Sequence, residues 1–145
     1  HLPKYLEGLK NIGLPQDPSG WRVAKCIFVA DDQKVAEAYA KSKDGPYGFY
    51  FSNLMKKLGG GGRIGLFGIT PDQPVEKITL EQSLHTQVIA GTVNSVVEQI
   101  IALREEVGPF GTLVYTGLDW ADKKLAQRSM VLMAEEVLPR VNRYI

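Results

Sequence analysis

The sequence predicts an α/β fold with a parallel sheet, and two observations lead to that class. Short apolar runs rich in β-branched residues recur along the 145 residues, and a helical stretch follows each run. Such alternation is typical of βαβ units, in which helices connect parallel strands by right-handed crossovers. The length is also sufficient for one domain with a sizeable core.

A helix and the first strand are predicted at the start of the chain. Leu2, Tyr5, Leu6 and Leu9 recur at helical spacing, with Pro3 in the first turn. The first strand is predicted at residues 21–30, whose second half is almost continuously apolar, as in a strand buried on both faces. Asp31 and Asp32 then offer an N-cap for a helix that contains Val35, Ala36, Ala38, Tyr39 and Ala40.

Two further strands are predicted, at residues 86–90 and 111–116. Gly91 and Thr92 follow the second strand and precede a helix over residues 93–107, for which Thr92 is the predicted N-cap. Residues 117–120 follow the third strand, and the last helix is expected over about residues 122–140.

Residues 44–79 lie between the first two units and show no clear periodicity. The four glycines 59–62 favour no fixed conformation, and residues 63–68 are predicted as a short extended piece. A stretch of this length inside a compact domain is either functional or disordered. We interpret it as an insertion or a lid-like segment, with packing under a long loop as the alternative for its aromatic residues Tyr47, Phe49, Tyr50 and Phe51.

The three predicted strands do not make a complete fold, because a small parallel sheet leaves its edges unpaired. They suit the last third of an eight-stranded barrel, which usually has about 250 residues. A small open α/β sheet is the alternative, although no glycine fingerprint for phosphate follows the first strand. We therefore predict that residues 1–145 are the C-terminal portion of a single (β/α)8 TIM-type barrel domain, with about three βα units and a long insertion.

Composition excludes several classes of partner. The formal net charge is +1, from 17 basic and 16 acidic residues, and no basic stripe suggests nucleic acid. The pairs Lys56-Lys57 and Lys123-Lys124 are interpreted as solvated helix faces. No apolar run reaches the length of a membrane span and no signal peptide is apparent, so we expect a cytoplasmic protein. Cys26 is the single cysteine, and no ligand cluster predicts a metal site.

The most specific part of the sequence is an ordered series of segments between residues 88 and 140. The series comprises residues 89–92, 96–100, 103–113, 116–122, 128–130 and 133–140. It resembles the luciferase-like flavin-dependent monooxygenases, and the likeness extends over about residues 21–143. Two positions depart from the family pattern: Val93 stands where Pro is common, and Leu118 stands where His is frequent.

The resemblance implies an FMN-dependent monooxygenase that uses reduced FMN and O2 to oxygenate a small, hydrophobic organic substrate. The three strands would then be strands six, seven and eight of the barrel. A separate flavin reductase and a homo-oligomer are further implied partners. The earlier strands, which carry most of the family's flavin contacts, are absent from this sequence, so this fragment alone is expected to be inactive. A deazaflavin-dependent dehydrogenase of the same fold and a non-catalytic α/β assembly fragment are the alternatives.

The candidate site residues lie in the loops after the strands, which form the active face of a barrel. Gly91 and Thr92 are candidates for cofactor binding, because a glycine and a hydroxyl at a helix N-terminus can accept a phosphate; a plain turn and cap is the alternative. Asp119 and Trp120 are candidates for the wall of the substrate or flavin pocket. Alternatively, Asp119 caps the last helix and Trp120 covers the end of the barrel. No catalytic residue is predicted.

Overall fold

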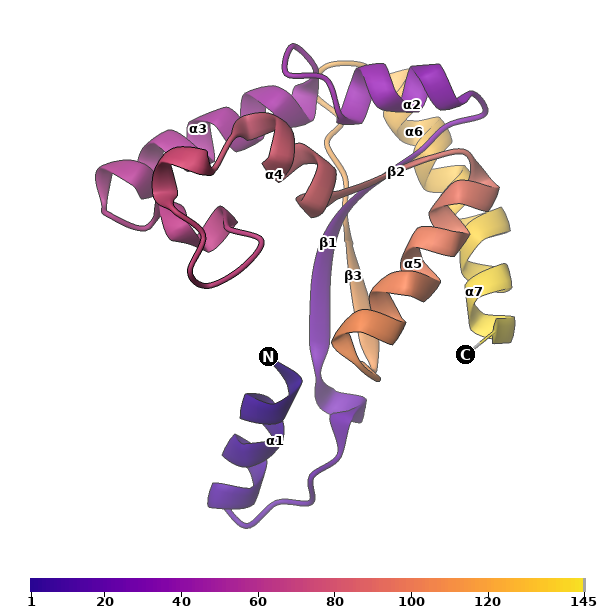
Figure 1. Ribbon diagram of the computed structural model, residues 1–145. Helices are drawn as coiled ribbons and strands as arrows, with labels where there is room; N and C mark the ends of the chain where they lie inside the picture. Colours follow the sequence, from indigo (N-terminus) through magenta and orange to yellow (C-terminus); the bar gives the residue numbers. More distant parts are fainter. Residues whose placement is uncertain (145) are drawn as a thin grey trace.

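The centre of the molecule is a three-stranded parallel sheet (Figure 1), seen in a computed structural model that describes residues 1–144. β1 spans Arg22–Val29, β2 spans Val88–Gly91 and β3 spans Thr112–Thr116. The strand order is β2-β1-β3. β3 pairs with the first half of β1 and β2 with the second half, so that Cys26 is opposite both Thr116 and Val88.

The α/β class and the parallel sheet are confirmed, but the strand order differs from that expected for consecutive barrel strands. Strands six, seven and eight of a barrel would place β2 between the other two, whereas β1 lies between them here. β1 is the longest strand, and Ile27, Phe28 and Val29 are at most 1% exposed. Helices cover both faces of its apolar end, which suits a continuously apolar segment.

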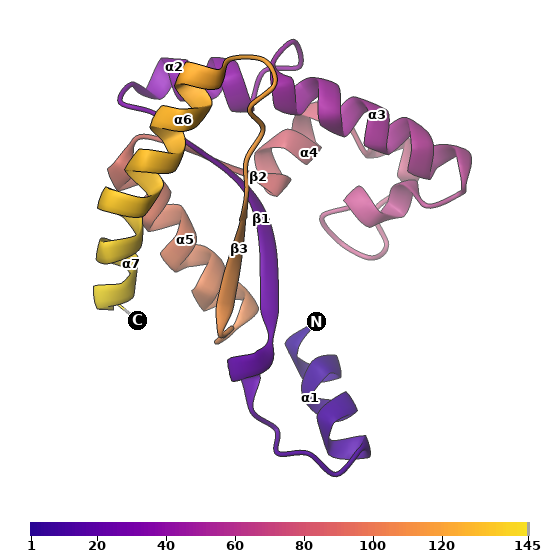
Figure 2. The same cartoon turned by 180° about the vertical axis from the view of Figure 1, so that it is seen from behind.

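Helices cover both faces of the sheet (Figures 1 and 2). Side chains alternate along β1, so Phe28 points to one layer while Ile27 and Val29 point to the other. The layer against Phe28 contains α2 (Gln33–Ala40), α3 (Pro46–Gly60) and α4 (Leu80–Gln87). The layer against Ile27 contains α5 (Val93–Val107), α6 (Lys123–Leu132) and α7 (Leu138–Tyr144).

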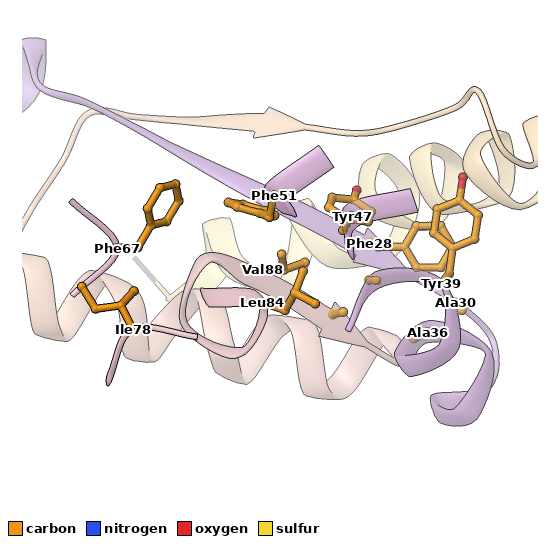
Figure 3. Packing of buried hydrophobic residues seen from close by; sticks show 12 residues of the cluster. Phe28, Ala30, Ala36, Tyr39, Tyr47, Phe51, Phe67, Ile78, Leu84 and Val88 are labelled. Carbon is orange, nitrogen blue, oxygen red and sulfur yellow. The ribbon is translucent and has the colours of Figure 1, made fainter. Parts of the chain in front are cut away.

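Aromatic side chains fill the layer against Phe28. The ring of Phe28 stacks on that of Tyr39, with centroids 4.2 Å apart and an interplanar angle of 10°. Tyr47 from α3 is fully buried beside them, and Phe51 lies one helical turn further along (Figure 3). Tyr47 and Phe51 therefore pack in the core.

The segment 44–79 is more regular than the sequence predicted. Residues Pro46–Gly60 form the 15-residue helix α3, where the sequence showed no clear periodicity. Ile64–Phe67 is a 3-10 helix, so the predicted extended piece at 63–68 is wrong. Pro46 stands in the first turn, where proline is tolerated, and the spacing of Tyr47 and Phe51 buries one face of the helix. This packing carries α3 through Gly59 and Gly60 despite their low helix propensity.

Most of the remaining elements follow the predicted bounds, but α4 was not predicted, and β2 begins two residues after the predicted start at residue 86. α1 spans Leu2–Asn11, and the last helix is divided into α6, a π-helical turn at Met133–Val137 and α7. The carboxylate of Asp122 caps α6 by accepting hydrogen bonds from the N–H groups of Lys124 and Leu125. Within residues 1–144, no helix is long and apolar enough to cross a membrane.

Candidate functional site

The loops after the three strands lie at the same end of the sheet, where the strands have their carboxyl ends, because the strands are parallel. β3 separates from β1 beyond Cys26, so the last residues of β1 have no strand on that side. The N–H of Ala30 donates to Gly91 on the β2 side. Since backbone groups alternate along a strand, the polar groups of Ile27 and Val29 must then point to the β3 side.

Two side chains satisfy these backbone groups in place of a strand. The hydroxyl of Tyr47 donates to the carbonyl oxygen of Ile27 at 3.0 Å. The N–H of Val29 donates to Oγ of Ser129, in α6, at 2.8 Å. Burial raises the pKa of Tyr47, so its hydroxyl remains a donor over the physiological range. These two hydrogen bonds hold α3 and α6 against the carboxyl end of β1.

A cavity of about 290 Å³ lies where β3 separates from β1. It is lined by Phe28, Tyr115, Gly117, Leu118, Asp119, Ala126 and Met130. The cavity is at the carboxyl ends of two strands whose following helices cover opposite faces of the sheet. In open α/β sheets this arrangement marks the usual ligand-binding crevice. The structure thus places the predicted site residue Asp119 in a cavity wall.

The loop 117–120 is fixed by a tyrosine from α2. The hydroxyl of Tyr39 donates to the carbonyl oxygen of Leu118 at 3.0 Å. Burial raises the pKa of Tyr39, which keeps the hydroxyl protonated. Asp119 does not cap the last helix, because Asp122 does so, and the side chain of Asp119 is exposed.

A second cavity, of about 720 Å³, lies on the other side of this loop, against α3. The rings of Phe49 and Trp120 meet edge to face in its wall, with centroids 5.5 Å apart and an interplanar angle of 66°. Its lining consists of Phe49, Tyr50, Asn53, Leu54, Lys56, Lys57 and Trp120. Trp120 is 53% exposed, so this ring lies open to the cavity.

Gly91 and Thr92 lie at the start of α5, as predicted. The side chain of Thr92 makes no capping hydrogen bond, so its hydroxyl is not used to start the helix. The N–H of Thr92 donates to Oε1 of Gln33 at 3.2 Å. A Cβ on Gly91 would lie 2.8 Å from this oxygen and from Oγ of Ser95, so a glycine is needed there. The loop after β2 therefore contacts Gln33, the first residue of α2.

Asp31 and Asp32 have structural partners. Oδ1 of Asp32 accepts the N–H of Val35 and caps α2. Asp31 accepts two hydrogen bonds from Arg128, at 2.9 and 2.7 Å, and these hold the pKa of its carboxyl below the usual value. In the part of the chain that the structure describes, no group of three or more His, Cys, Asp or Glu side chains could hold a metal ion.

The residues that join α3 to the site were not predicted from the sequence. Lys56 and Lys57 are exposed on α3, as interpreted from the sequence, and both also line the larger cavity beside Asn53. Phe49, Asn53 and Lys56 recur at helical spacing, and Pro46 before them is a residue favoured in the first turn of a helix. Together these two features could have predicted α3. The supporting roles of Tyr39, Tyr47 and Ser129 rest on long-range contacts, for which the sequence has no local signal.

Comparison with known proteins gives a consistent set of relatives. A 4-hydroxyprotoasukamycin monooxygenase of Streptomyces nodosus subsp. asukaensis is 29% identical over 126 residues, covering 87% of this chain and 32% of that protein. A 3,6-diketocamphane 1,6-monooxygenase of Pseudomonas putida is 28% identical, covering 97% of this chain and 37% of that protein. No family model matches the chain.

A solved structure extends this similarity to the fold. It is a type II Baeyer–Villiger monooxygenase, the oxygenating constituent of 3,6-diketocamphane monooxygenase from Pseudomonas putida, in complex with FMN. The TM-score is 0.77 at 26% identity, over 97% of this chain and 39% of that one. The chain thus spans less than two-fifths of the length of these relatives. The predicted resemblance to luciferase-like flavin monooxygenases is confirmed by these matches.

Proposed function

We propose that the protein acts as a flavin-dependent monooxygenase, which uses reduced FMN and O2 to oxygenate a small, hydrophobic organic substrate. The observation that carries this proposal is the fold similarity to an FMN-bound type II Baeyer–Villiger monooxygenase over 97% of the chain. The smaller cavity, at the carboxyl ends of β1 and β3, supports it, because α/β proteins bind small molecules at such places.

The residues at the start of α5 fit the phosphate of FMN. The first-turn N–H groups of a helix have no intrahelical partner and attract anions. The hydroxyl of Thr92 is not used as a cap, and Gly91 carries no side chain that would cover these groups. The amide oxygen of Gln33 now accepts the N–H of Thr92, and a phosphate would displace it. Gly91 and Thr92 are therefore the residues that we assign to phosphate binding.

The loop 117–120 has the groups to surround a flat ring. Leu118 and Phe28 contribute apolar groups to the lining of the smaller cavity. Asp119 supplies the carboxylate of that lining and can accept a hydrogen bond from an N–H or O–H group of a ligand. Trp120 presents an aromatic face to the larger cavity. Bound reduced FMN would supply the electrons for the reaction with O2.

The test is oxygen incorporation by the natural gene product that contains these 145 residues. The protein would receive FMN reduced by a separate flavin reductase, isotopically labelled O2 and a panel of apolar ketones that includes a diketocamphane. One labelled oxygen atom in an organic product supports the proposal. Conversion of all O2 to hydrogen peroxide across the panel, or absence of FMN binding, would refute it. Asp119→Asn should lower turnover while FMN affinity is kept.

The alternative functions receive less support. A deazaflavin-dependent dehydrogenase is not favoured, because the relatives found are monooxygenases. It would instead reduce deazaflavin by hydride transfer without consuming O2. For the 145 residues alone we propose inactivity, since they cover only 39% of the solved relative. If the 145 residues alone form no product in the same assay, the proposed inactivity is supported. Product formation would show that they are active by themselves.

We further propose that the chain forms the C-terminal part of a (β/α)8 barrel, with residues 44–79 as an insertion. Such a barrel requires β2 between β1 and β3, so β3 would exchange its β1 partner for β2 on assembly. Ala24 and Val114 are opposite each other in the described register. In a Cys26→Ser background, Ala24→Cys with Val114→Cys should form a disulfide in the 145-residue chain. The same pair should stay reduced in a complete barrel, and cross-linking there would contradict the proposal.

A further inference from the structure

We propose that the cavity between α3 and Trp120 is a binding site for an apolar ring compound that carries one anionic group. If the protein is a monooxygenase, as proposed above, this assigns a carboxylate-bearing ring compound as its substrate class. The inference rests on three features of the described residues: the volume of the cavity, its aromatic wall and its unbalanced positive charge.

The volume and wall favour a ring-shaped apolar ligand. A cavity of about 720 Å³ lies within the usual range for small-molecule sites. Three aromatic side chains line it, and they come from elements about 70 residues apart in the sequence: Phe49 and Tyr50 from α3, and Trp120 from the loop after β3. Phe49 and Trp120 are 63% and 53% exposed, so their faces remain available to a ligand.

The charge of the lining favours an anion. Lys56 and Lys57 both line the cavity, and among the described lining residues no side chain is acidic. Asn53 adds an amide whose Nδ2 donates to the carbonyl oxygen of Phe49, which fixes the side chain within the wall. The nearest carboxylate along the loop, Asp119, lines the smaller cavity instead.

The ring and the anion could come from two sources, an organic carboxylate or the phosphate-bearing flavin. Two pairs of probes distinguish them, because each pair differs in charge alone or nearly so: 2-naphthoate with 2-naphthamide, and FMN with riboflavin. Calorimetric titration of each probe into the protein, at low and at high salt, gives the dissociation constants. Binding is measured without turnover, so its result is independent of the oxygenation assay described above.

The proposal requires that 2-naphthoate bind more tightly than 2-naphthamide, by about two- to thirty-fold, and that salt remove the difference. Lys56→Gln with Lys57→Gln should weaken naphthoate by that factor and leave naphthamide unchanged. Lys10→Gln with Lys34→Gln removes the same charge from exposed positions outside the cavity, and should change neither probe. Trp120→Ala should weaken both probes about tenfold or more.

Three results would overturn the proposal. Equal affinity for naphthoate and naphthamide would show that the lysines do not bind the anionic group. Equal weakening by the two double-lysine variants would show a general charge effect. Competition between saturating FMN and naphthoate would assign the cavity to the flavin phosphate and exclude a separate substrate site. Naphthoate binding without oxygenation of any substrate would leave this site standing and contradict only the proposed function.

Discussion

Ser129 accepts a hydrogen bond from the backbone N–H of Val29, at 2.8 Å, across 100 positions of sequence. Its side chain stands where β3 would continue if that strand were longer, because β3 pairs with β1 only as far as Cys26. Ser129 is fully buried, and its hydroxyl also lies 3.4 Å from that of Tyr115. One serine therefore fastens α6 to the sheet beside the smaller cavity.

Ser129→Ala should destabilise the fold by about 1–3 kcal/mol, because it leaves a buried N–H without a partner. The measurement is the free energy of unfolding from urea titration. Met130→Ala is the matched control: Met130 is the next residue on α6 but is 57% exposed, so its replacement should change the free energy by about 0.5 kcal/mol or less. Equal losses in the two variants would show that the hydrogen bond contributes nothing specific.

The sequence was sufficient to predict elements whose local pattern matches their environment. The apolar end of β1 and the periodicity of α5 are visible in any short window, and both elements are found close to the predicted bounds. The fold class followed from their alternation. Thr92, Asp119 and Trp120 were likewise placed correctly after strands, because a strand end can be located from its sequence, whereas Gly91 is the last residue of β2.

The strand order and the second cavity could not be predicted in this way. Which strand lies beside β1 depends on pairing between residues such as Ala24 and Val114, which are 90 positions apart and carry no local mark of their partner. The helix α3 was missed because its glycines and aromatic residues have low helix propensity, and tertiary burial of Tyr47 and Phe51 outweighs that preference. Without α3, nothing indicated that Trp120 faces Phe49.

Tyr39→Phe should loosen the loop that carries the candidate site. The change removes the hydrogen bond to the carbonyl oxygen of Leu118 but keeps the stack on Phe28, so we expect a loss of about 0.5–1.5 kcal/mol. Faster amide hydrogen exchange should be confined to residues 117–120. Tyr5→Phe, in α1 at the far end of the sheet, is the control and should leave exchange in this loop unaltered. Unchanged exchange in Tyr39→Phe would mean that the hydroxyl does not hold the loop.

The pair Asp31–Arg128 should make a pH-dependent contribution to stability. Hydrogen bonds from Arg128 depress the pKa of Asp31 in the folded state, so its contribution is present above the ordinary value of 3.8 and is lost as the pH falls through the folded value. Asp31→Asn should therefore be less stable than the parent at neutral pH, and the difference should vanish in acid. The effect is small, because both side chains are exposed. A difference that persists unchanged in acid would contradict this assignment; Asp72→Asn, an exposed loop carboxylate, is the control.

Gly91→Ala should destabilise the protein and also weaken FMN binding. The effect on FMN binding distinguishes this variant from replacements of other glycines. The new Cβ would lie 2.8 Å from Oε1 of Gln33 and from Oγ of Ser95, and 2.9 Å from Cβ of Ser95, so the loop after β2 must shift. We expect a loss of about 1–3 kcal/mol, in line with overpacking at a buried position.

Gly60→Ala is the opposite control, since Gly60 is the last residue of α3 and has open space around it. Alanine there should be neutral or stabilise by up to about 1 kcal/mol. Thermal unfolding with and without FMN measures both effects, and an FMN-dependent shift that survives in Gly91→Ala would place the phosphate elsewhere.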